Sequence, residues 1–156
     1  LLAVNGFLMF SCLGPDSLRE LRVLFAERHW PAPAHELTDM HDWGDMLVQA
    51  GFAEPVMDME RITLTFDSPE RLLKELRTLG RNLNRARFAG LRGRQWRDQL
   101  HLGLRTGLAD NEGRLALTFE IIYGHAMKAA PRHSVKAETT LTLDQMRENL
   151  VRNRRA

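Results

Sequence analysis

The side chains with the clearest chemical meaning in this sequence are arginines gathered in one stretch. Between Arg77 and Arg105 the chain has eight arginines and a single acid, Asp98. These arginines stand at positions 77, 81, 85, 87, 92, 94, 97 and 105. A local excess of cations attracts an acidic partner. The first candidates for docking such a partner are Arg85, Arg87, Arg92 and Arg94.

Two other interpretations of the same arginines remain open. Arginines on a helix often form only a solvated face, because their apolar stems lie on the protein while the charge stays in water. They can also bind nucleic acid, but here only Phe88 and Trp96 are interleaved with them, and no nucleic-acid motif is present. An acidic protein is therefore the favoured partner, and no nucleic acid is expected.

Histidines near carboxylates are the next candidates for chemistry. Asp39 and Asp42 flank His41, which suggests a metal or acid/base site, although such residues at a helix start more often cap the helix. Tyr123 and His125 end a strand-like segment and could contact a substrate. No Cys/His spacing fits zinc, and the lone Cys12 excludes an internal disulfide. We predict no metal and no catalytic residue.

A turn follows the first strand-like run, Gly6 to Phe10, and comprises residues 11–16. Open α/β sheets bind ligands beyond the carboxyl ends of their strands, which makes this turn a candidate site. Gly14, Pro15 and Asp16 are also common turn residues and could serve only to reverse the chain and cap a helix.

The helices that must position these groups have recognisable starts and stops. Ser17 and Glu20 have capping-box spacing, which predicts a helix over 17–28. A second helix begins after Thr38 or Asp39 and stops at Gly51; a third begins at 67–70 and stops at Gly80. A weaker helix is predicted over 96–104.

Three segments have the pattern of strands. The run from Gly6 to Phe10 is apolar throughout, as in a parallel strand covered on both faces, so we expect neighbours on both sides of it. In 55–66 apolar residues alternate with threonines, which indicates one less buried face. In 115–123 the alternation suits a sheet edge or an antiparallel neighbour. The order of elements predicts an open α/β sheet with too few strands for its helices.

Composition limits the classes of protein that remain. The chain has 156 residues, of which 44% are hydrophobic and 27% charged, as in one globular domain or a large part of one. No apolar run approaches the roughly 20 residues of a membrane span, and the first ten residues lack the features of a signal peptide. These features predict a cytoplasmic protein without a membrane partner.

Four separated blocks resemble a known family. They read GFLMFSCLGPDSLRELR, DMHDWGDMLVQAGFAEPVMDMERITLTF, LLKELRTLG and LTFEIIYGHAMK. In this order they are similar to the C-terminal half of the malonyl-[acyl-carrier protein] O-methyltransferases of biotin synthesis. That family comprises class I, S-adenosylmethionine-dependent methyltransferases with a doubly wound, Rossmann-like sheet of seven strands.

The resemblance implies a division of the chain. Residues 1–130 would be the C-terminal half of the methyltransferase domain, with strands five to seven and a helical insertion over about 68–105. Residues 131–156 would be a polar tail with a possible short helix. None of the 11 glycines forms a Gly-x-Gly, so S-adenosylmethionine would be bound by a missing N-terminal half. As a fragment, the chain alone is expected to be inactive.

The resemblance also implies roles for site residues. The turn residues Ser11, Leu13, Gly14, Pro15 and Asp16 would border the methyl acceptor. The partner would be an acyl carrier protein that carries a malonyl thioester. Because the acceptor carboxylate is already an anion, alignment should suffice and no catalytic group is expected. Two alternatives are a non-catalytic remnant that binds the carrier protein, and a related methyltransferase-like assembly factor of respiratory complex I.

Overall fold

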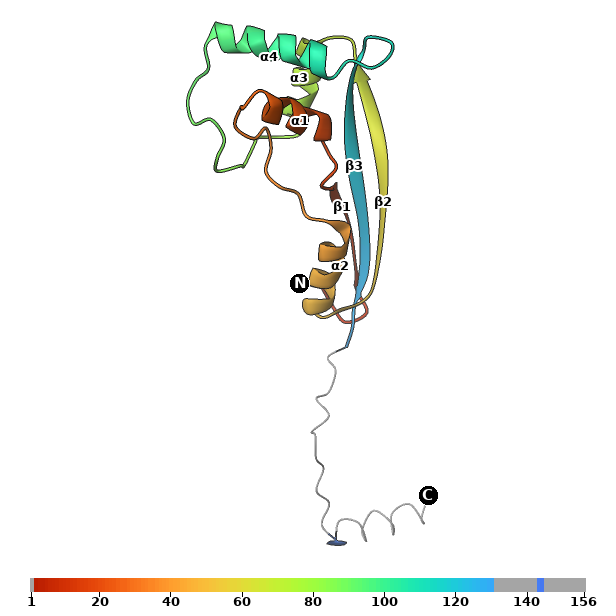
Figure 1. The fold of residues 1–156 in the computed structure, drawn as a ribbon. Helices are drawn as coiled ribbons and strands as arrows, with labels where there is room; N and C mark the ends of the chain where they lie inside the picture. The colour runs from red at the N-terminus through yellow and green to blue at the C-terminus, as the bar shows by residue number, and fades with distance from the viewer. Residues whose placement is uncertain (1, 131–142, 145–156) are drawn as a thin grey trace.

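The computed structural model describes residues 2–130 and 143–144. The predicted tail therefore lies almost wholly outside the described residues, and its short helix stays a prediction. Between residues 2 and 130 the chain is an α/β protein with one three-stranded sheet and four helices. The helices α1, α3 and α4 gather around one end of the sheet, and α2 lies along the other part (Figure 1).

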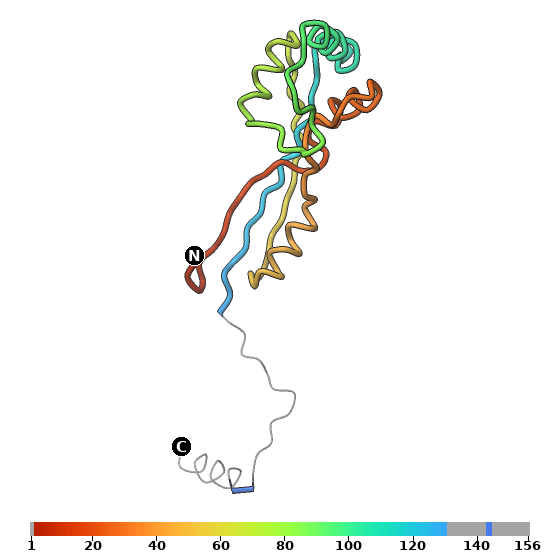
Figure 2. Tube along the Cα trace, turned by 90° about the vertical axis from the view of Figure 1, so that its left-hand side faces the viewer, coloured from red at the N-terminus to blue at the C-terminus, as the bar shows by residue number. Residues whose placement is uncertain are grey.

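The sheet has the order β1-β3-β2, and both pairings are antiparallel. Its strands are β1 (Phe7–Leu13), β2 (Phe52–Phe66) and β3 (Leu115–Lys128). Figure 2 shows the three strands side by side. The last strand therefore has the predicted antiparallel neighbours, but it lies in the centre of this sheet and not at its edge.

The environment of β1 differs from the prediction. Among the described residues its one strand neighbour is antiparallel, and alternate side chains are exposed, with Phe7 at 58% and Met9 at 70%. An apolar run indicates that both faces of a strand can be buried. It does not indicate whether the neighbouring strand is parallel or antiparallel. The expectation of parallel neighbours on both sides is thus not met within the described chain.

The helix bounds follow the predicted starts closely. The helices are α1 (Arg19–Glu27), α2 (Met40–Gln49), α3 (Pro69–Thr78) and α4 (Arg94–Gly107). The caps of α2 and α3 are confirmed: Asp39 Oδ1 accepts from the His41 amide at 2.8 Å, and Ser68 Oγ accepts from the Arg71 amide at 3.3 Å. These bonds satisfy amides that have no partner within the helix.

The capping box predicted for α1 is wrong. Leu18 occupies the N-cap position with a left-handed backbone (φ 58°), and no side chain caps this helix. Ser17 and Glu20 instead bond to β3, as described below. Tertiary partners have taken the hydrogen bonds that the local spacing would have used for capping.

The core joins three helices to one end of the sheet. Leu24 of α1, Leu72 of α3, Leu104 of α4 and Leu117 of β3 are each at most 3% exposed and belong to one cluster. Because α1, α3 and α4 all contribute to this cluster, the 11–16 turn before α1 and the 79–93 connector between α3 and α4 lie at the same end of the molecule. None of the helices among the described residues has the length and hydropathy needed to cross a membrane.

The other part of the sheet packs against α2 through aromatic contacts. The Phe10 and Trp43 rings lie 5.4 Å apart between centroids. Phe10 also lies over Gly124, its partner across the strands, where a Cβ atom would stand 2.2 Å from the ring. Glycine is needed at this position because the ring occupies the space of a side chain.

Candidate acceptor-side site

The predicted turn is fixed against one residue of β3, Glu120. The Gly14 amide donates to the Glu120 carbonyl at 2.9 Å, and the Asp16 amide donates to Glu120 Oε2 at 2.8 Å. Ser17 Oγ donates to the Glu120 carbonyl and accepts from the Glu120 amide, both at 3.0 Å. Four hydrogen bonds thus hold the turn that follows β1 in one place.

Gly14 is required by the close approach of the Glu120 side chain. A Cβ atom on residue 14 would lie 2.4 Å from Glu120 Oε2 and 2.8 Å from its carboxyl carbon. Such distances do not occur between real atoms, so a side chain here would displace the carboxylate. Gly14 was predicted from sequence as a turn residue, and the structure adds this packing reason.

Arg61 supplies the charge that compensates this carboxylate. It lies opposite Glu120 on β2, and its Nη2 is 3.6 Å from Glu120 Oε1. Its Nε donates to Asp16 Oδ2 at 2.8 Å. Because the Glu120 side chain is only 5% exposed, its charge needs a partner of opposite sign. Neither residue is among those predicted from the sequence; the available signal was that Glu120 is the one acidic residue of β3.

A second carboxylate anchors α1 to β3. Glu20 Oε2 accepts from the Thr118 amide at 3.0 Å, and Oε1 accepts from the Thr118 hydroxyl at 2.5 Å. Burial opposes the charged form of Glu20, but the hydrogen bonds from Thr118 outweigh it and lower its pKa. The start of α1, which follows the turn, is therefore rigidly placed.

The turn, α1 and the connector are linked by further bonds. Arg22 of α1 donates from Nη1 to the Pro15 carbonyl at 2.5 Å. In the connector, Asn82 and Asn84 donate to the carbonyls of Ala32 and Ala34 at 3.2 and 3.0 Å. The loop over residues 30–36 is therefore held between α1 and the arginine-rich connector.

The four candidate docking arginines have different environments. Arg92 lies over the rings of Phe88 and Trp96, at 4.5 and 4.0 Å from their centroids, and burial lowers its pKa. Arg87 is exposed and donates to the Asn82 carbonyl at 3.0 Å. Arg85 and Arg94 are exposed and have no side-chain partner within the described chain. Two of the four thus have structural contacts of their own.

The other predicted contact residues do not join the turn. His41 is exposed and its Nδ1 lies 2.9 Å from Asp39 Oδ1, so it belongs to the cap of α2. The Tyr123 hydroxyl donates to a Glu60 carboxylate oxygen; this bond is the main reason that the Tyr123 pKa is raised. His125 contacts Phe7, with 5.9 Å between ring centroids.

Metal and nucleophile chemistry find no support among the described residues. Over residues 2–130 and 143–144, His, Cys, Asp and Glu form no group of three that could hold a metal ion. Burial raises the pKa of the Cys12 thiol, which disfavours the thiolate needed for nucleophilic attack.

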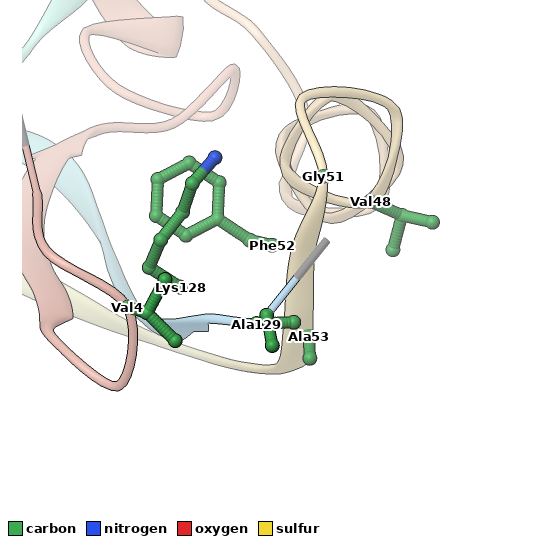
Figure 3. Close-up of a pocket in the computed structure, with 8 residues that line it drawn as sticks. Val4, Val48, Gly51, Phe52, Ala53, Lys128 and Ala129 are labelled. Carbon is green, nitrogen blue, oxygen red and sulfur yellow. The ribbon is translucent and has the colours of Figure 1, made fainter. Parts of the chain in front are cut away.

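One cavity lies away from the turn, at the other end of β1. Its volume is about 460 Å³, and it is lined by Val4, the end of α2 and the ends of β2 and β3 (Figure 3). Its cation, Lys128, stands over the Phe52 ring at 5.3 Å. No predicted site residue lines this cavity.

Comparison with curated proteins gives the class of the chain. No family model matches it. The chain is 45% identical over 140 residues to a malonyl-[acyl-carrier protein] O-methyltransferase of Nitrosospira multiformis, with 87% of this chain aligned. Proteins of the same name from Laribacter hongkongensis and Gallionella capsiferriformans are 44% and 47% identical, each over 84% of this chain. The sequence is thus related to O-methyltransferases.

The predicted family resemblance is confirmed: the relatives are malonyl-[acyl-carrier protein] O-methyltransferases. The chain spans about 44% of the length of the Nitrosospira and Laribacter proteins and 45% of the Gallionella protein. An α/β unit with a small sheet and four helices in its described part is consistent with one portion of a methyltransferase fold.

Proposed function

We propose that this chain forms the acceptor-side part of a malonyl-[acyl-carrier protein] O-methyltransferase. The whole protein would transfer a methyl group from S-adenosylmethionine to the free carboxyl of a malonyl thioester on acyl carrier protein. The resulting methyl ester would be the primer for pimeloyl and biotin synthesis. The sequence identity of 44–47% over 84–87% of the chain carries this proposal.

Within that fold, we assign β1, β2 and β3 as the fifth, sixth and seventh strands of a Rossmann-like sheet. The antiparallel pairing of β3 with both neighbours supports the assignment, since the seventh strand is expected to run against the others. The free edge of β1 would then pair with a strand from another part of the protein. The helices α3 and α4 would form the insertion before the last strand.

The residues described here do not fit a site for S-adenosylmethionine. Such a site needs a crevice at the ends of adjacent parallel strands and a glycine-rich turn, but β3 separates β1 from β2 and no Gly-x-Gly occurs. The methyl donor would therefore bind to the rest of a protein of the relatives' length. We expect the 156-residue chain alone to lack transferase activity.

The chemistry that remains for this part of the protein is positioning. A carboxylate accepts a methyl group without giving up a proton, so it needs no general base, only a fixed orientation. The 11–16 turn is fixed by its bonds to Glu120, and Arg22 joins it to α1. We assign the turn to the border of the acceptor site.

The acidic partner would be the carrier protein itself. Arg85 and Arg94 are exposed and unpaired among the described residues, so their charges are available to a partner. Arg92 would act by holding the connector in shape through Phe88 and Trp96. If the carrier protein binds to this protein but no methyl group is transferred, the second candidate function, a non-catalytic carrier-binding protein, is favoured.

The proposal is tested by a transfer assay. The assay uses the native protein purified from its source cells. Malonyl carrier protein is incubated with S-adenosylmethionine, and the intact mass of the carrier is measured. We expect a gain equal to one methylene group. Acetyl carrier protein, which has no free carboxyl, is the control and should not change. Absence of the gain on malonyl carrier protein, or the same gain on both, refutes the function.

A further inference from the structure

A second cavity lies beside the turn, between α1, the 30–36 loop and the connector. Its volume is about 380 Å³, within the range of small-ligand sites. Its walls are largely apolar and include Phe25, Trp30 and Pro33, and Asn84 of the connector also lines it. Arg22 is the one arginine or lysine that lines it.

Arg22 has an unused donor in this place. Its Nη1 donates to the Pro15 carbonyl, but its Nη2 is buried and bonds to nothing in the described chain. No carboxylate of a described residue forms an ion pair with it. A buried charged donor without an acceptor is costly, so a guanidinium that turns toward an anion in the cavity would gain a partner.

The lining favours a carboxylate among small anions. A planar carboxylate suits the fork of a guanidinium. Glu36 also lines the cavity and is exposed; its charge repels a phosphate with two negative charges more strongly than a carboxylate with one. The apolar walls suit a short carbon chain behind the charged group.

We propose that the Arg22 guanidinium binds the free carboxylate of a short dicarboxylic acyl group in this cavity. This inference rests on the proposed function, and it names the residue that would select the acyl group. The cavity adjoins both the turn, through Pro15, and the arginine connector, through Asn84. A carrier docked on the connector would present its acyl group at this place.

The assignment has a consequence for turnover. The ion pair exists with the carboxylate and is lost once the carboxyl is esterified, because the product is neutral. Arg22 would therefore bind the substrate more tightly than the product and reject acyl groups that have no second carboxyl. A charge-assisted hydrogen bond of this kind corresponds to a preference of at least about tenfold.

Calorimetric titration of the 156-residue chain tests the proposal. The probe is the malonyl amide of pantetheine, a stable analogue of the thioester, compared with its methyl ester. We expect at least about tenfold tighter binding of the free acid, loss of this preference in Arg22→Gln, and partial retention in Arg22→Lys. Arg28→Gln changes an exposed arginine at the end of the same helix and should keep the preference.

Three results would overturn the assignment: no preference for the free acid, a preference that survives Arg22→Gln, or equal binding of inorganic phosphate. If Arg22→Gln does not fold, nitrogen-15 NMR of the unaltered chain decides. The Arg22 side-chain signal should shift with the free acid and not with the methyl ester; a signal that stays in place rejects the proposal. The transfer assay above is a separate readout, so acid binding without methyl transfer would refute only the proposed function.

Discussion

Arg61 of β2 and Glu120 of β3 face each other across the sheet, and Nη2 of the arginine lies 3.6 Å from Oε1 of the glutamate. The same guanidinium holds Asp16 at 2.8 Å, so one arginine joins the turn to two strands. The nearly buried Glu120 carboxylate thus lies beside a cation from the neighbouring strand.

Removal of this cation is expected to destabilise the fold. Arg61→Met should lower the free energy of unfolding by about 1–2 kcal/mol, a value reduced from that of a fully buried pair because Arg61 is 50% exposed. Urea unfolding measures the change. In a double-mutant cycle, Asp16→Asn should cost less in the Arg61→Met background than in the unaltered chain. Strictly additive losses would show that the two side chains do not interact.

Two glycine substitutions should have opposite signs. Gly14→Ala places a methyl group against the Glu120 carboxylate and should destabilise by about 1–3 kcal/mol. Gly44→Ala lies within α2, where the nearest atom to the new Cβ is 3.7 Å away, and should stabilise by about 0.5–1 kcal/mol. Thermal unfolding of both variants checks the pair. A neutral Gly14→Ala would contradict the close packing at the turn.

Because of Glu20, the folded protein is expected to lose stability in acid. Its pKa is lowered in the folded protein, so it contributes stability above its unfolded pKa of about 4.3, and this contribution disappears as the pH falls through the lower folded value. Unfolding measured between pH 6 and about pH 2 should therefore be less pH-dependent in Glu20→Gln. Glu27→Gln, which removes an exposed carboxylate of the same helix, is the matched control.

Tyr123 offers a direct optical test of its bond to Glu60. It is the only tyrosine in the chain, so the ultraviolet absorbance of tyrosinate reports on it alone. Its pKa is raised mainly by the hydrogen bond to Glu60, with a smaller effect of the Asp58 charge. Glu60→Gln should bring the pKa back toward the ordinary value, and Asp58→Asn should lower it less. The reverse order would exclude Glu60 as the main cause.

Charge reversal tests the docking surface. Arg85→Glu with Arg94→Glu should weaken binding of an acyl carrier protein at least about tenfold and flatten its dependence on salt concentration. Arg28→Glu reverses an exposed arginine that is not part of the connector and is the matched control. Fluorescence anisotropy of a labelled carrier protein measures both. Unchanged affinity and salt dependence in the double variant would remove these arginines from the interface.

Local sequence signals predicted where helices and strands begin and end. They predicted less well which distant residues these elements contact. Asp39 and Ser68 cap their helices as their spacing indicates, because a cap needs only residues two or three positions away. Ser17 and Glu20 have the same kind of spacing, but they bond to residues 103 and 98 positions away. Spacing along the chain contains no information about such distant competitors.

The candidate site shows the same limit. The turn was predicted from its place after a strand, but its partners Glu120 and Arg61 lie in strands distant in sequence and were missed. Among the arginines, charge density alone could not separate Arg92, which stacks on Phe88 and Trp96, from the exposed Arg85. Arg22 was overlooked because its significance depends on a buried atom without a partner.

The most direct test of the central claim is a chimera. The aligned 140-residue segment of the Nitrosospira multiformis protein is replaced by this chain, and methyl transfer to malonyl carrier protein is followed by mass. If this chain is the acceptor-side part of such an enzyme, the chimera will form the methyl ester on malonyl but not on acetyl carrier protein. A folded chimera that binds S-adenosylmethionine yet forms no ester would contradict the account.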